Sequence, residues 1–470
     1  MTAILALLLA GGLLVWFVRL ERGRRPVLVI AFLLAVVIVE AAIYQSQNEI
    51  PDGIFHPEYG ALSFRLLDVL IPAAILARLL QPKRAATPLN PTVLLWLALL
   101  AWLATAGVIG LYDGNPTKLV GFHAKAIIYL GALVLAAGVP LEQYVARRRL
   151  ERFLAPTAAL ALALIASDIA QVDITADLPL LPLQDLGTMG SDAATIFSGL
   201  GALALAIGLF SDERRGRLLA FAVPLLVSPA VADQRAAFIG LALALATVVI
   251  GVLLSRRRVR VTATEGALAV AAVGAILLVS ALPGVVADRS VKLPLQDRLT
   301  TTFGSYEEVL TTRDRLNQWS AARRLVAERP ILGWGLGEQY TYYDPGHLVF
   351  RQIDLTHNIF GDVLLRTGAV GLALFLFALG ATAAGLARTW WREADDRAAA
   401  FALGAGAVVA GLLGKGMAES VFEKYRLAVV LGLAIGAVIA AGHAARRGGA
   451  SRVGAASSRG RDLRLAEDLV

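Results

Sequence analysis

Three groups of polar residues in an otherwise apolar chain have types and spacings that suit anion binding and proton transfer. The first is Arg235, which follows a short apolar stretch, 218–232, interrupted by Pro224 and Pro229. About fifteen helical residues rise roughly 22 Å, which is less than the ~30 Å hydrocarbon core of a bilayer. We therefore expect Arg235 to lie in a polar recess or at an indented interface. A simple turn in which Asp233 pairs with Arg235, without a ligand, is the alternative.

The second group lies in the segment 314–340. Arg315 and Trp319 are four residues apart, so in a helix they share one face, where a guanidinium and an indole can shape a recess for an anionic or sugar ligand. Exposed amides in a glycine-rich turn can bind an anion, although an ordinary helix-terminating turn is an equally good interpretation. A Rossmann turn and a nucleotide P-loop are excluded, because no strand precedes the glycines and no Lys-Ser/Thr follows them. The glycines of this turn, which follow Pro330, are Gly333, Gly335 and Gly337.

The third group, 356–368, lies at the predicted start of a long helix. His357 and Asn358 stand where unpaired amides and the helix dipole favour an anion. A histidine has a pKa suited to proton transfer near neutrality, but at such a position it is more often a cap or a satisfied polar residue. Asp362 and Arg366 are four residues apart, and we interpret them first as an ion pair within the membrane and second as a functional site.

Together these groups predict an anion site beside a base at the outer surface of a membrane. Lipid-linked pyrophosphates are available at that surface, whereas nucleotide sugars are not. Two or three arginines would hold the diphosphate and stabilise its charge as the bond to the sugar breaks. A base would take the proton from an acceptor hydroxyl. The residues therefore favour transfer of a glycan from a polyprenyl pyrophosphate.

The elements that must position these residues are membrane helices. Of the 470 residues, 57% are hydrophobic and 17% are charged, and the mean hydropathy is +0.67. This composition excludes a soluble enzyme, a disordered chain and a disulfide scaffold. The chain has no cysteine, so it has neither a thiol nucleophile nor a Cys-based metal site. We predict an all-α, polytopic membrane protein with about 12–13 transmembrane helices. The predicted spans are 2–18, 26–45, 61–80, 91–112, 119–139, 153–171, 191–210, 218–232, 236–254, 264–287, 358–387, 398–413 and 427–443.

Charge in the loops predicts the orientation of these spans. The net charge of +8 would suggest nucleic acid if the basic residues formed one patch. Instead, the short loops on one side carry 20 Lys and Arg, against five on the other. The positive-inside rule then places the N-terminus outside and the basic C-terminal tail in the cytoplasm. We expect no nucleic-acid partner.

The predicted spans divide the chain into four parts. Residues 1–287 form an N-terminal transmembrane bundle, and 288–356 form one large outer-face (periplasmic) loop, in which 306–328 has a helical pattern. Residues 357–443 form C-terminal transmembrane helices. Residues 444–470 form a disordered basic cytoplasmic tail.

An ordered set of motifs within 313–371 resembles the O-antigen ligase and polymerase superfamily. The set is Arg315-x-x-x-Trp319, Glu328-Arg329-Pro330-Ile331-Leu332-Gly333-Trp334-Gly335-Leu336-Gly337, His357-Asn358 and Gly368-x-x-Gly371. The resemblance implies a bacterial inner-membrane glycosyltransferase with a GT-C-like helical fold. It would act at the outer face, by inversion and without metal or cofactor. Its partners would be an undecaprenyl-pyrophosphate-linked glycan donor, a glycan or lipid-glycan acceptor and membrane lipids.

The resemblance also assigns roles to residues. His357 matches the loop histidine that activates the acceptor, and Arg315 matches the arginine four residues before the loop tryptophan, which binds the pyrophosphate. Arg235 resembles an arginine that opens a mid-chain span and shares that role, but its context, Ala232-Asp233-Gln234-Arg235-Ala236-Ala237, departs from the expected Ser-Arg-Gly. We expect further substrate contacts from Trp319, Asn358, Arg313 and Arg324.

Alternatives to this assignment stay open. A ligase and a polymerase share these motifs and differ in acceptor, and the sequence does not choose between them. A transporter or flippase for lipid-linked glycans would show broken helices in related halves and polar residues near mid-membrane. Glu40, Arg65 and Asp68 offer some of this, but no halves repeat. A structural partner in envelope assembly is a third hypothesis.

Overall fold

Membrane helices make up most of the structure. This computed structural model describes residues 11–13, 15–20, 25–43, 58–59, 62–63, 66–79, 90–170, 189–210, 215–232, 236–255, 306–393, 395–422 and 424–444. Among these residues, eight helices are long and apolar enough to cross a membrane. They are α4 (Pro91–Tyr112), α5 (Thr117–Ala137), α7 (Arg147–Ala170), α8 (Ser191–Phe210), α10 (Ala236–Leu253), α14 (Ile359–Arg392), α15 (Asp396–Gly416) and the C-terminal helix (Tyr425–Ala444). The predicted all-α, polytopic architecture is confirmed.

Shorter helices lie at further predicted spans. α2 (Pro26–Ile43) agrees closely with the span predicted at 26–45. α3 (Leu66–Leu79) is shorter than the span predicted at 61–80, in which Leu62 and Ser63 form a strand instead. α6 (Leu141–Tyr144) is a single turn that precedes α7. The span predicted at 264–287 and most of that at 2–18 fall outside the described residues.

The span predicted at 218–232 is broken at one of its two prolines, because α9 (Arg215–Val227) continues through Pro224 and ends before Pro229. α9 ends where the 3-10 turn η1 (Ser228–Ala230) begins, and Pro229 lies in that turn. A proline lacks the amide hydrogen and its ring crowds the preceding turn, which disfavours a regular helix at Pro229. The chain therefore leaves this helix short of a full membrane crossing.

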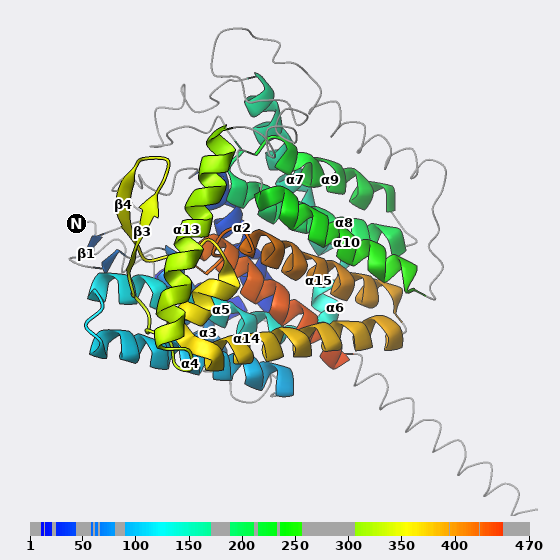
Figure 1. The fold of residues 1–470 in the computed structure, drawn as a ribbon. Coiled ribbons are helices and arrows are strands. Elements are labelled where there is room, and N and C mark those ends of the chain that lie inside the picture. Colours follow the sequence, from blue (N-terminus) through cyan, green and yellow to red (C-terminus); the bar gives the residue numbers. More distant parts are fainter. Residues whose placement is uncertain are drawn as a thin grey trace, which may run out of the picture.

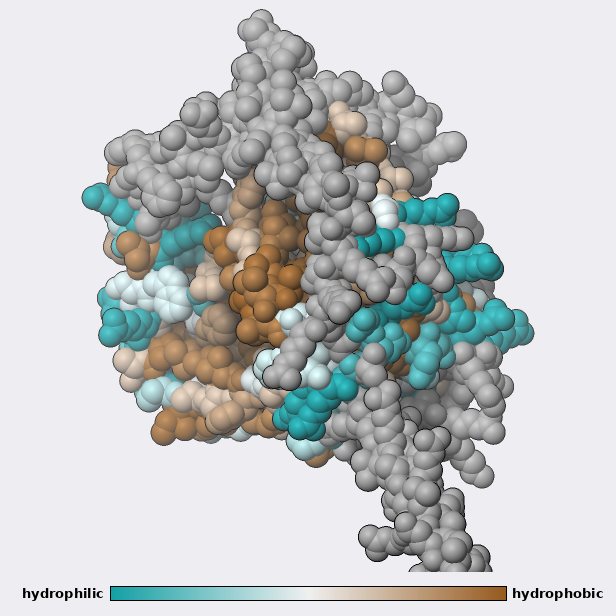
Figure 2. Space-filling view, turned by 90° about the vertical axis from the view of Figure 1, so that its right-hand side faces the viewer, coloured by the Kyte–Doolittle hydropathy of each residue, from teal (hydrophilic) through white to brown (hydrophobic). Residues whose placement is uncertain are grey.

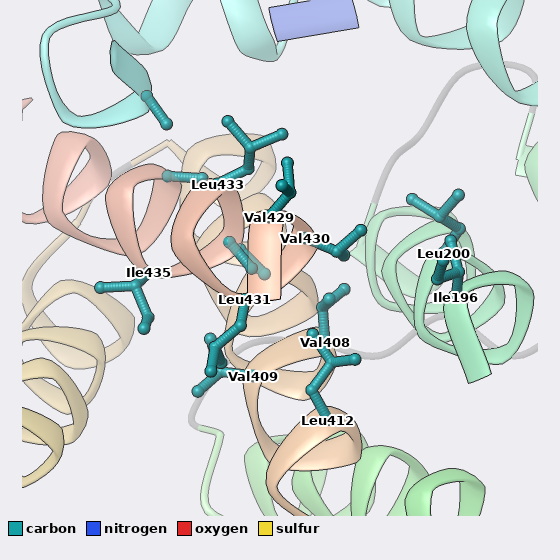
Figure 3. Close-up of a cluster of buried hydrophobic side chains, with 14 of the residues drawn as sticks. Ile196, Leu200, Val408, Val409, Leu412, Val429, Val430, Leu431, Leu433 and Ile435 are labelled. Atoms are coloured by element: carbon teal, nitrogen blue, oxygen red, sulfur yellow. The ribbon is translucent and has the colours of Figure 1, made fainter. Parts of the chain in front are cut away.

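The helices α8, α10 and α15 pack tightly together. For α8 and for α15, 89% of the apolar stretch is buried inside the protein. Small residues bring backbones close: a Cβ placed on Gly240 of α10 would lie 2.8 Å from the carbonyl oxygen of Gly411 in α15. Figure 3 shows Ile196 of α8 opposite Val408 and Leu412 of α15, with side chains of the C-terminal helix closing the cluster.

A second group consists of α4, α5, α14 and the C-terminal helix. In Figure 1, α4 and α14 lie side by side along much of their length. The indole Nε1 of Trp96 in α4 donates a hydrogen bond to Thr382 Oγ1 of α14, at 3.0 Å. The rings of Tyr129 in α5 and Tyr425 in the C-terminal helix are 5.8 Å apart. These contacts fix α14, whose first residues carry the candidate site.

Part of the predicted outer loop covers one end of this bundle. α13 (Tyr306–Glu328) coincides with the helix predicted there and, in Figure 1, runs across the axes of α4, α5 and α14. It packs against the antiparallel hairpin of β3 (Tyr340–Asp344) and β4 (Val349–Ile353), in which Tyr340 pairs with Ile353. A second, very short hairpin joins β1 (Glu58–Tyr59) to β2 (Leu62–Ser63).

Apolar side chains also cover much of the outside of the molecule. Val108 of α4, Leu253 of α10 and Phe377 of α14 are each at least 66% exposed. On the face that Figure 2 shows, apolar residues form a continuous area in the centre, and hydrophilic residues gather at its margins. Exposed apolar surface of this extent is expected where helices face lipid.

Candidate functional site

The helix α13 provides one wall of the candidate site. Its Trp319 lies directly on the first turn of α14, where a Cβ on Gly361 would come within 2.3 Å of Cη2 of the indole. Because Gly361 has no side chain, the indole can rest on the helix backbone. Arg315 is exposed and lies one turn earlier on the same face of α13. The sequence prediction that these two residues share a face is therefore confirmed.

Asn358 determines where α14 begins. Its Oδ1 accepts hydrogen bonds from the amides of Phe360 (2.9 Å) and Gly361 (3.1 Å), which makes it the N-cap of the helix. Its Nδ2 donates to the carbonyl oxygen of Met417, at 3.0 Å, and so ties the start of α14 to the end of α15. The second hydrogen on Nδ2 has no partner among the described residues. A substrate contact by Asn358 stays a prediction.

His357, the residue before this cap, is half-buried, and its imidazole makes no hydrogen bond to any described residue. Burial and the positive charge of Arg315 lower the pKa of His357 below its ordinary value of 6.5, while Glu419 and Asp314 act to raise it and Lys424 to lower it. A lowered pKa leaves the imidazole neutral near pH 7, so it is able to accept a proton. The structure thus brings His357 and Arg315 together, from separate elements.

The turn after α13 docks into a break in α14. At Gly368 the backbone adopts φ 63° and ψ −169°, which interrupts the helix in a region that only glycine occupies readily. The break frees backbone groups that would otherwise bond within α14, and the turn pairs with them. The four hydrogen bonds run from Trp334 N to Leu365 O (3.0 Å), Gly335 N to Arg366 O (3.0 Å), Ala369 N to Pro330 O (2.8 Å) and Val370 N to Ile331 O (3.3 Å).

The glycine turn is not an anion nest. Its remaining amides are also occupied: Gly333 donates to the Arg329 carbonyl, Leu336 to the Ala106 carbonyl and Gly337 to Nδ1 of His123. No amide between 333 and 337 is left to bind an anion, so that interpretation is wrong. The interpretation as a helix-terminating turn is correct but incomplete, since the turn also joins α13 to α4, α5 and α14.

A buried cluster of charged residues, which we call the Lys415 cluster, lies beside His357. Lys415 is fully buried, with Nζ 2.7 Å from Asp192 Oδ1 and 3.5 Å from Glu419 Oε2. Lys424 Nζ lies 2.5 Å from Glu419 Oε2 and 3.4 Å from Asp192 Oδ1, and Arg426 Nη1 lies 4.0 Å from Asp192 Oδ2. Three cations thus face two carboxylates. This cluster places excess positive charge where an anionic donor is expected.

Sequence reasoning missed the Lys415 cluster. In the sequence, Lys415, Lys424 and Arg426 look like charges of a short loop between two spans, and no motif surrounds Asp192. The available signal was the presence of Asp192 and Lys415 at the ends of strongly apolar spans, where charge is costly and normally paired or functional.

The pair formed by Asp362 and Arg366 is confirmed. Arg366 Nη2 lies 2.9 Å from Asp362 Oδ1, and both side chains are buried. The hydroxyl of Ser420 donates to Asp362 Oδ2 at 3.1 Å, and Arg366 also donates to the carbonyl oxygen of Asp354 at 2.6 Å. The pair therefore joins α14 to the segment after α15 and to the chain just before His357.

Two predicted substrate-binding residues lie elsewhere. Arg313 and Arg324 are exposed on α13, two positions before and nine positions after Arg315. At about 100° per residue they point to roughly the opposite side of the helix from Arg315. Nothing within the described part of the chain connects them with His357. Their substrate contacts stay predictions.

Arg235 falls outside the described residues, but the helix that follows it is well defined. α10 begins at Ala236. Its first turns lie on the last turns of α15, since a Cβ on Gly414 would be 3.0 Å from the carbonyl oxygen of Ile239. The start of α10 is thus at the same end of the bundle as the Lys415 cluster. A role for Arg235 in binding the donor stays a prediction.

Comparison with known protein families agrees with the resemblance that the motifs within 313–371 indicate. Residues 220–376, about a third of the chain, match the family model described as O-antigen ligase. The match begins in α9 and ends in α14, so it includes α13, the docked turn, the hairpin and His357. Comparison of the chain with curated proteins gives no match. Residues 220–376 are thus similar to the O-antigen ligase and polymerase superfamily, which supports a general role in glycan transfer, and the eight apolar helices among the described residues support a multi-pass membrane protein.

Proposed function

We propose that the protein transfers a glycan from an undecaprenyl-pyrophosphate-linked donor to an acceptor hydroxyl at the outer face of the bacterial inner membrane. The family match supports glycan transfer in general. The observation that carries the finer proposal is a half-buried histidine with a lowered pKa, His357, beside the cation Arg315. A base next to a binding group for phosphate is the minimum that such a transfer needs.

In the proposed reaction, His357 is the general base. The acceptor oxygen attacks the anomeric carbon of the donor sugar and forms the new glycosidic bond. The bond from that carbon to the phosphate oxygen breaks, and its electron pair leaves with undecaprenyl pyrophosphate. The acceptor proton passes to the imidazole of His357. A base with a positioned lone pair contributes about 10²- to 10⁴-fold to a rate.

The diphosphate is proposed to bind between Arg315 and the Lys415 cluster, with Arg235 as a further ligand. When no anion is bound, the positive charge of Arg315 disfavours the protonated form of His357. A bound diphosphate would neutralise that effect, so the imidazole would gain proton affinity once the donor is in place. Charge that develops on the leaving group would be stabilised by groups already oriented toward it.

The test is transfer by purified protein in liposomes that contain the undecaprenyl-pyrophosphate-linked repeat unit, with products separated on gels. We expect longer lipid-linked chains from a polymerase, or glycan on an added lipid-glycan acceptor from a ligase. His357→Ala should abolish either product and keep donor binding. His347→Ala is the matched control, because His347 belongs to the same outer region but sits at the hairpin tip, with its side chain 65% exposed and paired with Asp344.

Either of two results would overturn the proposal. Full activity in His357→Ala would show that His357 is not the general base. Movement of the donor between leaflets without any new glycosidic bond, under all acceptor conditions, would identify a flippase instead.

A further inference from the structure

A buried histidine in α5, His123, contacts both ends of the segment that contains the β-hairpin. The amide of Gly337, just before β3, donates to its Nδ1 at 3.0 Å. On the other side of the ring, Nε2 lies 3.2 Å from Oδ2 of Asp354, just after β4. Because Nδ1 accepts a hydrogen bond, the neutral ring carries its proton on Nε2, toward the carboxylate.

The contact between His123 and Asp354 is linked through the backbone to the candidate site. Asp354 is three residues before His357, and its carbonyl oxygen accepts a 2.6 Å hydrogen bond from Arg366 of α14. Although burial acts to raise it, the pKa of Asp354 is held below its ordinary value by its contacts with His123 and Arg366. A charged Asp354 is thus held between α5 and α14. The chain from Asp354 to His357 is fixed from both of these helices.

His123 is also well isolated from water, with 1% of its side chain exposed. A buried polar ring is costly unless both nitrogens find partners. Only a neutral imidazole or a carboxamide offers an acceptor and a donor on opposite edges, which is what Gly337 and Asp354 require. An apolar residue of similar size would fill the space but would supply neither the acceptor for the Gly337 amide nor the 3.2 Å contact with the partly exposed Asp354 carboxylate.

We propose that His123 is a positioning residue, which clamps Gly337 and Asp354 and thereby holds the backbone from which His357 reaches its substrate. This inference rests on the proposed function of His357 as the base. His123 itself touches neither donor nor acceptor. A misplacement of about 1 Å in catalytic geometry can lower a rate by ~100-fold.

The proposal is tested with His123→Leu, His123→Gln and Asp354→Ala in the liposome assay. We expect His123→Leu to lower kcat by about 10- to 100-fold with little change in the KM for the lipid-linked donor. His123→Gln should recover most of kcat, because the carboxamide supplies an acceptor and a donor. Asp354→Ala should match His123→Leu, and the double variant should be little worse than either single one.

The control is Ile127→Leu, a partly buried position one turn further along the same helix, which should keep kcat. Equal losses in His123→Leu and His123→Gln, or a purely additive double variant, would overturn the clamp. If His123→Leu fails to fold, Asp354→Ala decides the question in its place, with an unchanged kcat counting against the proposal.

A readout that does not depend on transfer separates this inference from the proposed function. Amide hydrogen exchange of residues 338–356 should speed up in His123→Leu and in Asp354→Ala, while exchange in α15 stays unchanged. Faster exchange together with an inactive wild type would refute glycan transfer and leave the clamp standing. Unchanged exchange in both variants would refute the clamp, whatever the activity.

Discussion

Replacing Gly368 with alanine should disrupt the junction of the predicted outer loop with the membrane helices. At φ 63° and ψ −169° this residue occupies a backbone region that alanine avoids. A Cβ at this position would lie 2.1 Å from the carbonyl oxygen of Ile331. That oxygen also accepts the hydrogen bond from Val370, so the clash falls on the junction itself.

The expected loss of stability follows from two contributions. The backbone conformation costs an alanine about 1–3 kcal/mol. Separating the turn from the helix enough to fit the methyl group removes the bonds donated by Ala369 and Val370, at about 1 kcal/mol each. The free energy of unfolding should therefore fall by roughly 3–5 kcal/mol, and the lower figure corresponds to a change of about 150-fold in the unfolding equilibrium.

Reversible unfolding in mixed detergent and SDS micelles measures this loss. The matched control is Gly380→Ala, which lies in the same helix and has no atom within 4 Å of its added Cβ. It should keep or raise stability, by up to about 1 kcal/mol, because alanine favours the helix. Equal unfolding midpoints for Gly368→Ala and Gly380→Ala would refute the role given to the break in α14.

Two further predictions concern charge. If neutral His357 is the base, kcat/KM for transfer should rise as pH increases through the lowered pKa of His357. Arg315→Gln removes one cause of that lowering and should move the rising limb of the kcat/KM profile to higher pH. Arg315→Lys keeps the positive charge and should leave the limb in place. An unmoved limb in Arg315→Gln would contradict the coupling. Lys415→Met should lower the free energy of unfolding by about 3–5 kcal/mol, because it leaves Asp192 buried without its nearest cation, and adding Asp192→Asn should restore a large part of it. A single variant as stable as the wild type in SDS titration would rule this out.

The membrane helices could be predicted from the sequence because each crossing of a bilayer requires about twenty apolar residues. α4 and α8 have the predicted bounds, and the helical spacing of Leu316, Leu325 and Val326 was enough to locate α13. Such patterns are local. They need no knowledge of which helix packs against which.

The parts that could not be predicted depend on long-range contacts. The spacing of Gly333 and Gly335 does not indicate that their turn enters a break in α14. The break is defined by the positive φ of Gly368, which the sequence does not specify. The sequence around His123 likewise carries no motif that indicates its contacts. Its partner Asp354 lies far along the chain, and their contact depends on how α5 packs beneath the loop.

The docked turn also limits how the loop can be exchanged between relatives. A segment that shares backbone hydrogen bonds with α4 and α14 cannot be transplanted as a cassette, because the recipient helices must supply matching carbonyls, amides and a glycine at the break. The tip of the hairpin differs, since Leu348 and Phe350 are each 75% exposed. Chimaeras joined between Asp344 and Val349 should therefore fold, whereas those joined at Pro330 should fail unless α14 is exchanged along with the loop.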